Sequence, residues 1–219
     1  MVDLISGLRS DVVRDNLARV RRRIADAGRD PDHVEILAAI KYLPAGELRA
    51  LADGGIAVVG ENRAQELVAK QEVAGDAFTW DFIGRLQSRK VRDLIGRVRY
   101  IHSVASDSAL EQLRRYGTPD TRVMIEVNVA GEDAKGGIAP AQLPGFLERC
   151  PVAVVGLMTM PPQADDPERN RPYFAALREL AQRHELHHLS MGTSQDYAVA
   201  AAEGATIVRL GTSLYRISA

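Results

Sequence analysis

The stretch Ile36-Leu-Ala-Ala-Ile-Lys-Tyr-Leu-Pro44 points to the fold. Its five successive apolar residues, bounded by a lysine and then a proline, are typical of a strand buried in a parallel sheet. A lysine is unusual at the end of such a strand, because burial strips the ammonium group of its water. Two interpretations of Lys41 stay open. Its side chain points into solvent, or it is a desolvated, uncharged amine that can form Schiff bases with aldehydes.

Seven more strand-like apolar segments follow along the chain and alternate with stretches of helical spacing. Strands are predicted at 33–41, 57–62, 79–84, 100–104, 122–128, 152–160, 187–192 and 206–211. Helices are predicted at 4–27, 45–52, 64–71, 88–95, 108–116, 141–149, 167–184 and 194–202. Alternation of this kind implies parallel strands joined by right-handed crossovers. Eight units favour a closed (β/α)8 barrel of TIM type with an extra N-terminal helix, and an open doubly wound sheet is the alternative.

Length and composition limit the possible classes of protein. The 219 residues fit one barrel domain spanning 1–219, and the net charge of −1 gives no reason to expect nucleic acid or acidic membranes as partners. Charged residues interrupt the N-terminus, so no signal peptide or membrane span is predicted. Cys150 is the single cysteine and has no partner for an internal disulfide. We therefore expect a cytoplasmic protein, and we expect a monomer because the sequence shows no evident large apolar patch.

Two segments near the C-terminus predict a phosphate site. Leu189-Ser-Met-Gly-Thr-Ser194 leaves the seventh strand, and Arg209-Leu-Gly-Thr-Ser213 leaves the eighth. Both offer glycine, hydroxyls and backbone N–H groups, and barrels often bind phosphate with the loops that follow these two strands. The alternative is structural: Thr193 or Ser194 is a plain helix cap, and the glycines serve only as turn residues.

Other polar residues also have two interpretations. Arg209 lies in an apolar strand and needs a partner, which is either Glu126 or an acceptor atom of a ligand in the barrel mouth. Asn62 follows the second strand and is either a helix cap or a site residue. The sequence His184-Glu-Leu-His-His188 matches a zinc-protease pattern, but a helix ends there and a strand begins, so no metal site is predicted.

A set of short motifs in a fixed order resembles the YggS/PROSC family of pyridoxal phosphate homeostasis proteins. The resemblance covers residues 4–216. The motifs are Ile40-Lys-Tyr-Leu-Pro44, Gly60-Glu-Asn62, Gln65-Glu66, Trp80-Asp-Phe-Ile-Gly84, Leu86-Gln-Ser88, Lys90, Ile101-His-Ser103, Val127-Asn128, Lys135, Gly137-Ile138, Gly156-Leu-Met158, Leu189-Ser-Met-Gly192, Asp196-Tyr197 and Val208-Arg-Leu-Gly211.

The resemblance implies a barrel of pyridoxal 5′-phosphate (PLP) fold type III, similar to the N-terminal domain of alanine racemase. It implies that Lys41 holds PLP as a covalent aldimine and that Arg209 contacts the pyridine nitrogen. The remaining cofactor-binding positions that it implies are Asn62, Met158, Ser190, Met191, Gly192, Thr193, Gly211 and Thr212.

The function implied by the resemblance is PLP homeostasis, in which the protein carries and buffers the cofactor without robust catalysis. PLP-dependent apo-enzymes are candidate partners. A weak amino-acid racemase is the alternative, with Tyr197 or Tyr215 as the second base, and a cofactor-free Schiff-base aldolase ranks third. The chain departs from the family pattern at Arg63, Asp81 and Arg85, where the pocket rim is expected, and at Arg89 and the segment Ser213–Arg216.

Overall fold

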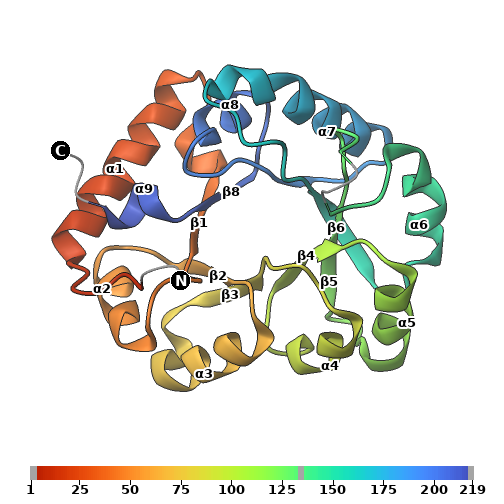
Figure 1. Ribbon diagram of the computed structural model, residues 1–219, viewed down its shortest axis with the longest axis horizontal. Coiled ribbons are helices and arrows are strands. Elements are labelled where there is room, and N and C mark those ends of the chain that lie inside the picture. Colours follow the sequence, from red (N-terminus) through yellow and green to blue (C-terminus); the bar gives the residue numbers. More distant parts are fainter. Residues whose placement is uncertain (1–3, 133–135, 217–219) are drawn as a thin grey trace.

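Eight parallel strands close into a barrel in the computed structural model, which describes residues 4–132 and 136–216. Lys135 of the quoted motifs lies outside the described residues. The last strand pairs with the first, with Glu35 opposite Ile207 and Ala38 opposite Leu210. This pairing confirms the (β/α)8 barrel and excludes the open sheet (Figure 1). The strands are β1 Glu35–Ala39, β2 Val58–Glu61, β3 Thr79–Phe82, β4 Tyr100–Val104, β5 Arg122–Glu126, β6 Ala153–Met158, β7 His188–Ser190 and β8 Ile207–Leu210.

The helices form a ring outside the strands, as the crossover connections require (Figure 1). They are α1 Ser10–Asp26, α2 Leu48–Asp53, α3 Ala64–Ala74, α4 Val91–Leu94, α5 Asp107–Tyr116, α6 Leu143–Arg149, α7 Arg171–Arg183, α8 Tyr197–Ala202 and α9 Thr212–Tyr215. Single 3₁₀ turns lie at Pro31–His33, Ala45–Glu47, Gly75–Ala77, Ser88–Lys90, Pro140–Gln142 and Pro167–Asn170.

Several elements are shorter than the sequence predicts. Strand β1 ends at Ala39, because the chain turns where the Leu43 N–H donates to the Ile40 carbonyl over 3.0 Å. Strand β7 ends at Ser190, and helix α8 begins at Tyr197 instead of residue 194. The ends of these elements lie in the loops expected to form the site, where side-chain and turn contacts take over from regular pairing.

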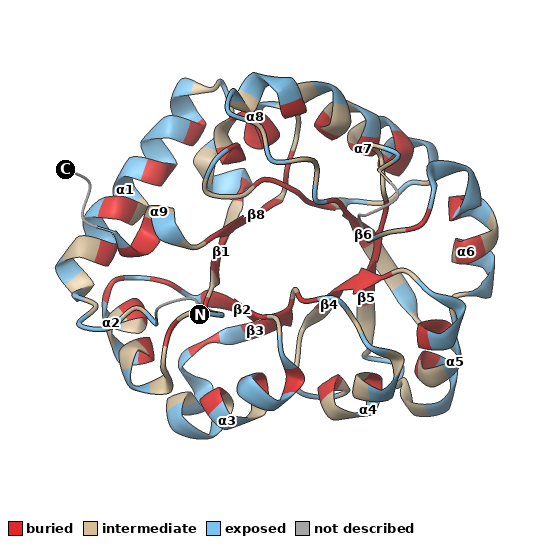
Figure 2. Ribbon diagram, in the orientation of Figure 1, coloured by how far each residue is buried: buried red, intermediate tan, exposed pale blue. Residues whose placement is uncertain are grey.

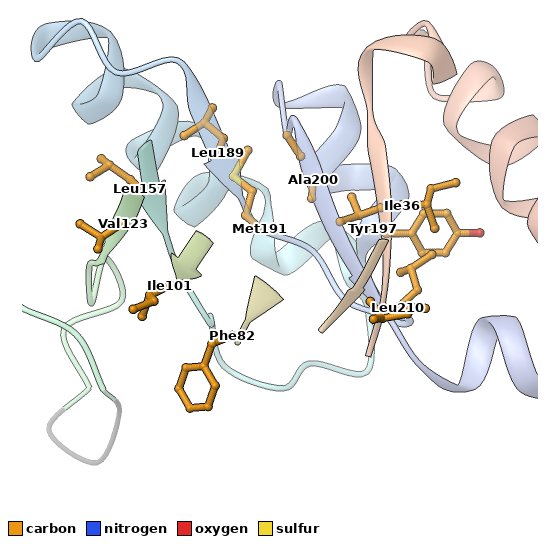
Figure 3. Packing of buried hydrophobic residues seen from close by; sticks show 14 of the residues in the cluster. Ile36, Phe82, Ile101, Val123, Leu157, Leu189, Met191, Tyr197, Ala200 and Leu210 are labelled. Carbon is orange, nitrogen blue, oxygen red and sulfur yellow. The ribbon is translucent and has the colours of Figure 1, made fainter. Parts of the chain in front are cut away.

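Apolar side chains form two clusters, one on each side of the barrel wall. The larger one fills the space between strands and helices, and Figure 3 shows part of it, with Ile36 of β1 and Leu210 of β8 labelled. The smaller one follows from the period-two alternation of the strands and fills the barrel interior. Its buried members are Leu37, Val58, Met124, Met158 and Ile207. Burial accordingly marks the strands and the inward faces of the helices in Figure 2.

The extra N-terminal helix α1 closes the ring beside α9. Its apolar stripe buries Val13, Val20 and Ile24, each worth about 1.5–3 kcal/mol when fully removed from water. The buried Asn16 donates from Nδ2 to the carbonyls of Leu214 (3.1 Å) and Arg216 (2.9 Å). Helix α1 therefore anchors the segment that follows β8, which lines the candidate site.

Two features of the fold bear on classes of protein considered above. Helix α7 ends at Arg183 and β7 begins at His188, so His184 and His188 do not share a helix, as the sequence predicts. Among residues 4–132 and 136–216, no helix combines the length and the apolar character that crossing a membrane requires.

Candidate PLP site at the carboxyl ends of the strands

A cavity of about 510 Å³ opens at the carboxyl ends of the barrel strands. Seven of the residues predicted from the sequence line it, and they come from both halves of the chain. They are Lys41, Asn62, Met158, Thr193, Arg209, Gly211 and Thr212. Ser190, Met191 and Gly192, which were predicted with them, do not line it. Reactive groups gather at this end in (β/α)8 enzymes, so the position fits a functional site.

Lys41 lies two residues beyond the end of β1 and is exposed to solvent at the cavity wall. Its Nζ lies 4.8 Å from the centre of the Tyr42 ring. Of the two interpretations, the desolvated lysine in a buried strand is therefore wrong, and the side chain that points into solvent is confirmed. The position at the mouth of the barrel remains as predicted, and it leaves the amine accessible to a ligand in the cavity.

A buried ion pair holds the backbone next to Lys41 and next to Asn62. Lys70 of α3 donates from Nζ to the Glu61 carboxylate (2.6 Å) and to the Ile40 carbonyl (2.8 Å), next to Lys41. The Asn62 N–H donates to the other Glu61 oxygen over 2.6 Å.

Asn62 does not cap the helix that follows it. Helix α3 begins at Ala64, its N-cap residue is Arg63, and no side chain accepts a hydrogen bond there. The capping interpretation is thus wrong, and Asn62 lies instead on the cavity wall.

Arg209 forms part of the cavity floor and is 6% exposed. Its Nη1 donates to the Ser190 carbonyl (2.6 Å) and hydroxyl (2.5 Å), and its Nη2 donates to the Thr159 carbonyl (2.9 Å) and contacts the Met160 sulfur (2.8 Å). No ion pair joins it to Glu126 among the described residues, so that proposed partner is wrong. Burial lowers the pKa of Arg209 to about 10, while the charges of Glu126 and Asp196 oppose this shift.

The loop after β7 turns sharply at Gly192, which has a φ of +90°. A side chain there would place its Cβ 2.6 Å from Ala200, so this position requires glycine for the turn. The N–H and hydroxyl of Thr193 donate to the Asp196 carboxylate over 2.7 and 3.0 Å. The N-cap residue of α8 is Asp196, so neither Thr193 nor Ser194 caps the helix.

The turn after β8 presents backbone N–H groups to an oxygen atom. The Ser194 hydroxyl accepts from the N–H groups of Gly211 and Ser213, both over 3.2 Å. Gly211 has a negative φ of −118°, and a Cβ there would meet only the Ala39 carbonyl at 3.8 Å. Its lack of a side chain keeps the wall open to a ligand.

The residues predicted on and after β7 that miss the cavity have other roles. Ser190 is fully buried inside the barrel, where its hydroxyl contacts Arg209 and His102. Met191 is fully buried and belongs to the outer apolar cluster, where Figure 3 labels it.

The departures from the family pattern also separate in space. Arg85 lines the cavity, Arg63 is exposed outside it, and Asp81 is fully buried within the barrel. Asp81 is therefore not a rim residue, contrary to the expectation.

Glu126 is a cavity residue that sequence reasoning considered only as a partner for Arg209. It lies at the end of β5, is 9% exposed, and forms no side-chain hydrogen bond within the described part of the chain. Burial raises the pKa of its carboxyl group, and the charges of Arg209 and Arg85 oppose the shift. Alternation from the inward-facing Met124 is the signal that could have placed it.

The two tyrosines considered as bases have structural contacts. Tyr197 lies in the outer apolar cluster (Figure 3). Tyr215 lines the cavity, but its hydroxyl donates to the Ala39 carbonyl over 3.0 Å, and burial raises its pKa. Neither hydroxyl is placed as an available base in this structure.

Comparisons with known proteins identify the family and the fold. The family model described as alanine racemase, N-terminal domain, matches residues 8–219. A curated relative from Aquifex aeolicus, named pyridoxal phosphate homeostasis protein, is 42% identical, and the match covers 91% of this chain and 93% of the relative. The structure of PipY from Synechococcus elongatus PCC7942 with PLP bound is 32% identical, with a TM-score of 0.78 over 93% of this chain and all of that chain.

A more distant likeness concerns the fold alone. Alanine racemase from Corynebacterium glutamicum is 16% identical and superposes with a TM-score of 0.75 over 99% of this chain and 64% of that enzyme. The ordered motifs, the barrel and the two closer relatives lead to one conclusion. This chain belongs to the alanine racemase N-terminal domain family and, within it, to the pyridoxal phosphate homeostasis proteins.

Proposed function

We propose that this protein binds PLP as a Schiff base on Lys41 and acts in intracellular PLP homeostasis. In this role it carries and buffers the cofactor, limits free aldehyde, and supplies PLP to apo-enzymes. The observation that carries the proposal is one cavity that combines an accessible amine, a buried guanidinium and turn N–H groups that face an oxygen. The name of the Aquifex relative and the PLP-bound PipY structure support it.

The donor set fits a phosphorylated aldehyde with a ring nitrogen. Lys41 supplies the amine, which condenses with an aldehyde and releases water. Gly211, Thr212 and Thr193 would hold the phosphate, in a place where the Ser194 oxygen already accepts two backbone hydrogen bonds. Arg209 would face the ring nitrogen, and Asn62 and Met158 would line the ring.

Arg209 favours binding over strong catalysis. With a pKa of about 10, its guanidinium stays charged at neutral pH and can only donate to the ring nitrogen. When bound, PLP supplies an electron sink, and its strength falls when the ring nitrogen is unprotonated. A racemase would also need a second base, and the Tyr215 hydroxyl is bonded to a backbone carbonyl.

The first test is a spectroscopic titration of the purified protein with PLP, followed by borohydride reduction and peptide mass analysis. We expect a visible absorption band that bleaches on reduction, with the mass adduct on the peptide that contains Lys41. Lys41→Ala should lose both. Lys90→Ala is the matched control, because Lys90 pairs with Asp93 and does not line the cavity. A wild-type protein that stays colourless with PLP and gains no adduct would contradict the proposal and favour the cofactor-free aldolase.

A second test separates a carrier from an enzyme. PLP-loaded protein should restore activity to a PLP-dependent apo-enzyme, and it should release the cofactor without converting amino acids. Racemisation of an amino acid that disappears in Lys41→Ala would support the racemase instead. Light scattering of the same preparation tests the proposed monomer, and fractionation of cells tests the proposed cytoplasmic location.

A further inference from the structure

A chain of polar side chains crosses the apolar interior of the barrel. Asp81 of β3, His102 of β4 and Ser190 of β7 are fully buried, and Arg209 of β8 is 6% exposed. They lie on four different strands beside the inner apolar cluster. Buried polar groups of this kind destabilise a fold unless they are hydrogen-bonded to each other. The hydrogen bonds among these four side chains are therefore required for a stable barrel.

The hydrogen bonds that link these four side chains fit one assignment of protons. Arg209 Nη1 donates to the Ser190 hydroxyl over 2.5 Å, which leaves the Ser190 proton to point at His102 Nδ1, 2.8 Å away. His102 Nδ1 then acts as an acceptor, and its Nε2 carries the proton that is donated to Asp81 over 3.1 Å.

Arg99 holds the Asp81 end of this row of polar side chains. It donates from Nη2 to the Asp81 carboxylate over 2.6 Å and from Nη1 and Nη2 to Glu35 over 2.8 and 2.6 Å. Arg99 and Glu35 line a second cavity of about 520 Å³ at the amino ends of the strands. A continuous hydrogen-bonded path thus runs from this end of the barrel to the floor of the candidate PLP site.

Burial inside the barrel favours the neutral form of His102. Asp81 faces it from one side, Arg209 and Arg99 lie near it, and the Tyr100 ring lies 6.2 Å away between ring centres. Burial lowers the pKa of His102, and the two arginines lower it further, whereas Asp81 raises it. In the neutral form, His102 Nδ1 carries no proton and can accept a hydrogen bond from the Ser190 hydroxyl. Each hydrogen bond along the path from Arg209 to Asp81 then has one donor and one acceptor.

We propose that Ser190, His102 and Asp81 are positioning residues that hold the Arg209 guanidinium at the floor of the PLP site. The inference rests on the proposed function and assigns Ser190 a role that differs from phosphate binding. Asp81 is one of the positions where this chain departs from the family pattern, so the path is tied to this sequence.

The test uses Ser190→Ala, which removes the hydroxyl between Arg209 and His102. The lost hydrogen bond involves a charged group and is therefore of the stronger class, but Arg209 keeps three other contacts. We therefore expect PLP affinity to fall about tenfold. Thr206→Val is the matched control. It also removes a side-chain hydrogen bond, which the Leu189 N–H of β7 donates to the residue just before β8, but it leaves the contacts of Arg209 in place. Its PLP affinity should match the wild type.

A double-mutant cycle separates positioning from general loosening of the barrel. Ser190→Ala should have little further effect on PLP affinity in an Arg209→Gln background, because its effect passes through the guanidinium. A tenfold loss that persists in that background would overturn the proposal, as would an unchanged affinity of Ser190→Ala alone.

A measurement on the unliganded wild type stands independently of PLP and of variant folding. Nitrogen-15 NMR of the imidazoles should show His102 as the neutral Nε2–H form, and a charged ring or the Nδ1–H form would contradict the path. If the wild type binds no PLP, the proposed function fails together with this inference. If the wild type binds PLP and Ser190→Ala binds it equally well, only the positioning role fails.

Discussion

Replacing Lys70 with methionine should destabilise the protein strongly, although Lys70 does not line the cavity. The Lys70 and Glu61 side chains are 5% and 1% exposed, and their charged atoms lie 2.6 Å apart. The replacement leaves the Glu61 carboxylate and the Ile40 carbonyl without this donor inside the protein. Removing one partner of a buried ion pair costs about 3–5 kcal/mol.

That cost converts to a measurable change in melting temperature. In a protein of this size 1 kcal/mol corresponds to roughly 2–4 °C, so Lys70→Met should melt about 6–20 °C below the wild type. Calorimetry and urea unfolding with the ligand-free protein measure both quantities. Weakened support of the Ile40 carbonyl should also lower PLP affinity, because Lys41 is the next residue.

Two further variants complete the design. Lys90→Met breaks the ion pair between Lys90 and Asp93, and these two side chains are 23% and 34% exposed. The free energy of unfolding should therefore fall by less than about 1 kcal/mol. Adding Glu61→Leu to Lys70→Met removes the orphaned carboxylate and should recover part of the loss. A Lys70→Met protein as stable as Lys90→Met would refute the reasoning that burial sets the cost.

Glycine and histidine positions give the remaining predictions. Gly192→Ala should cost about 3 kcal/mol or more in urea unfolding, because of its positive φ and the 2.6 Å approach to Ala200. Gly211→Ala should cost less than about 1 kcal/mol but weaken PLP binding in a titration, since its methyl group would fill the cavity wall. Burial holds the pKa of His102 below its ordinary 6.5, so the unfolded chain gains a proton first and stability falls as pH drops below that value. His102→Gln should flatten this fall by up to about 1.4 kcal/mol per pH unit, and an unchanged slope in pH-dependent unfolding would contradict the shift.

The amino-acid pattern is sufficient to predict the barrel and to place several polar residues at its mouth. Apolar segments that alternate with helical spacing imply parallel strands, and their number favours closure. The carboxyl ends of parallel strands meet at one edge, so the positions of Lys41, Asn62 and Arg209 at strand ends suffice to place them near each other. Period-two alternation also put Arg209 on the same face as Ile207 and Gly211, which agrees with the inner cluster and the cavity wall.

Two features follow only from the folded barrel: the residue at which each strand ends, and the side chains that face each other across the interior. Lys41 is exposed because it lies within the turn that follows β1, and Ser190 points inward at the last position of β7. The contact between His102 and Ser190 joins residues 88 positions apart in the chain. It exists because the barrel is closed, and local patterns carry no record of which strands closure brings together across its interior.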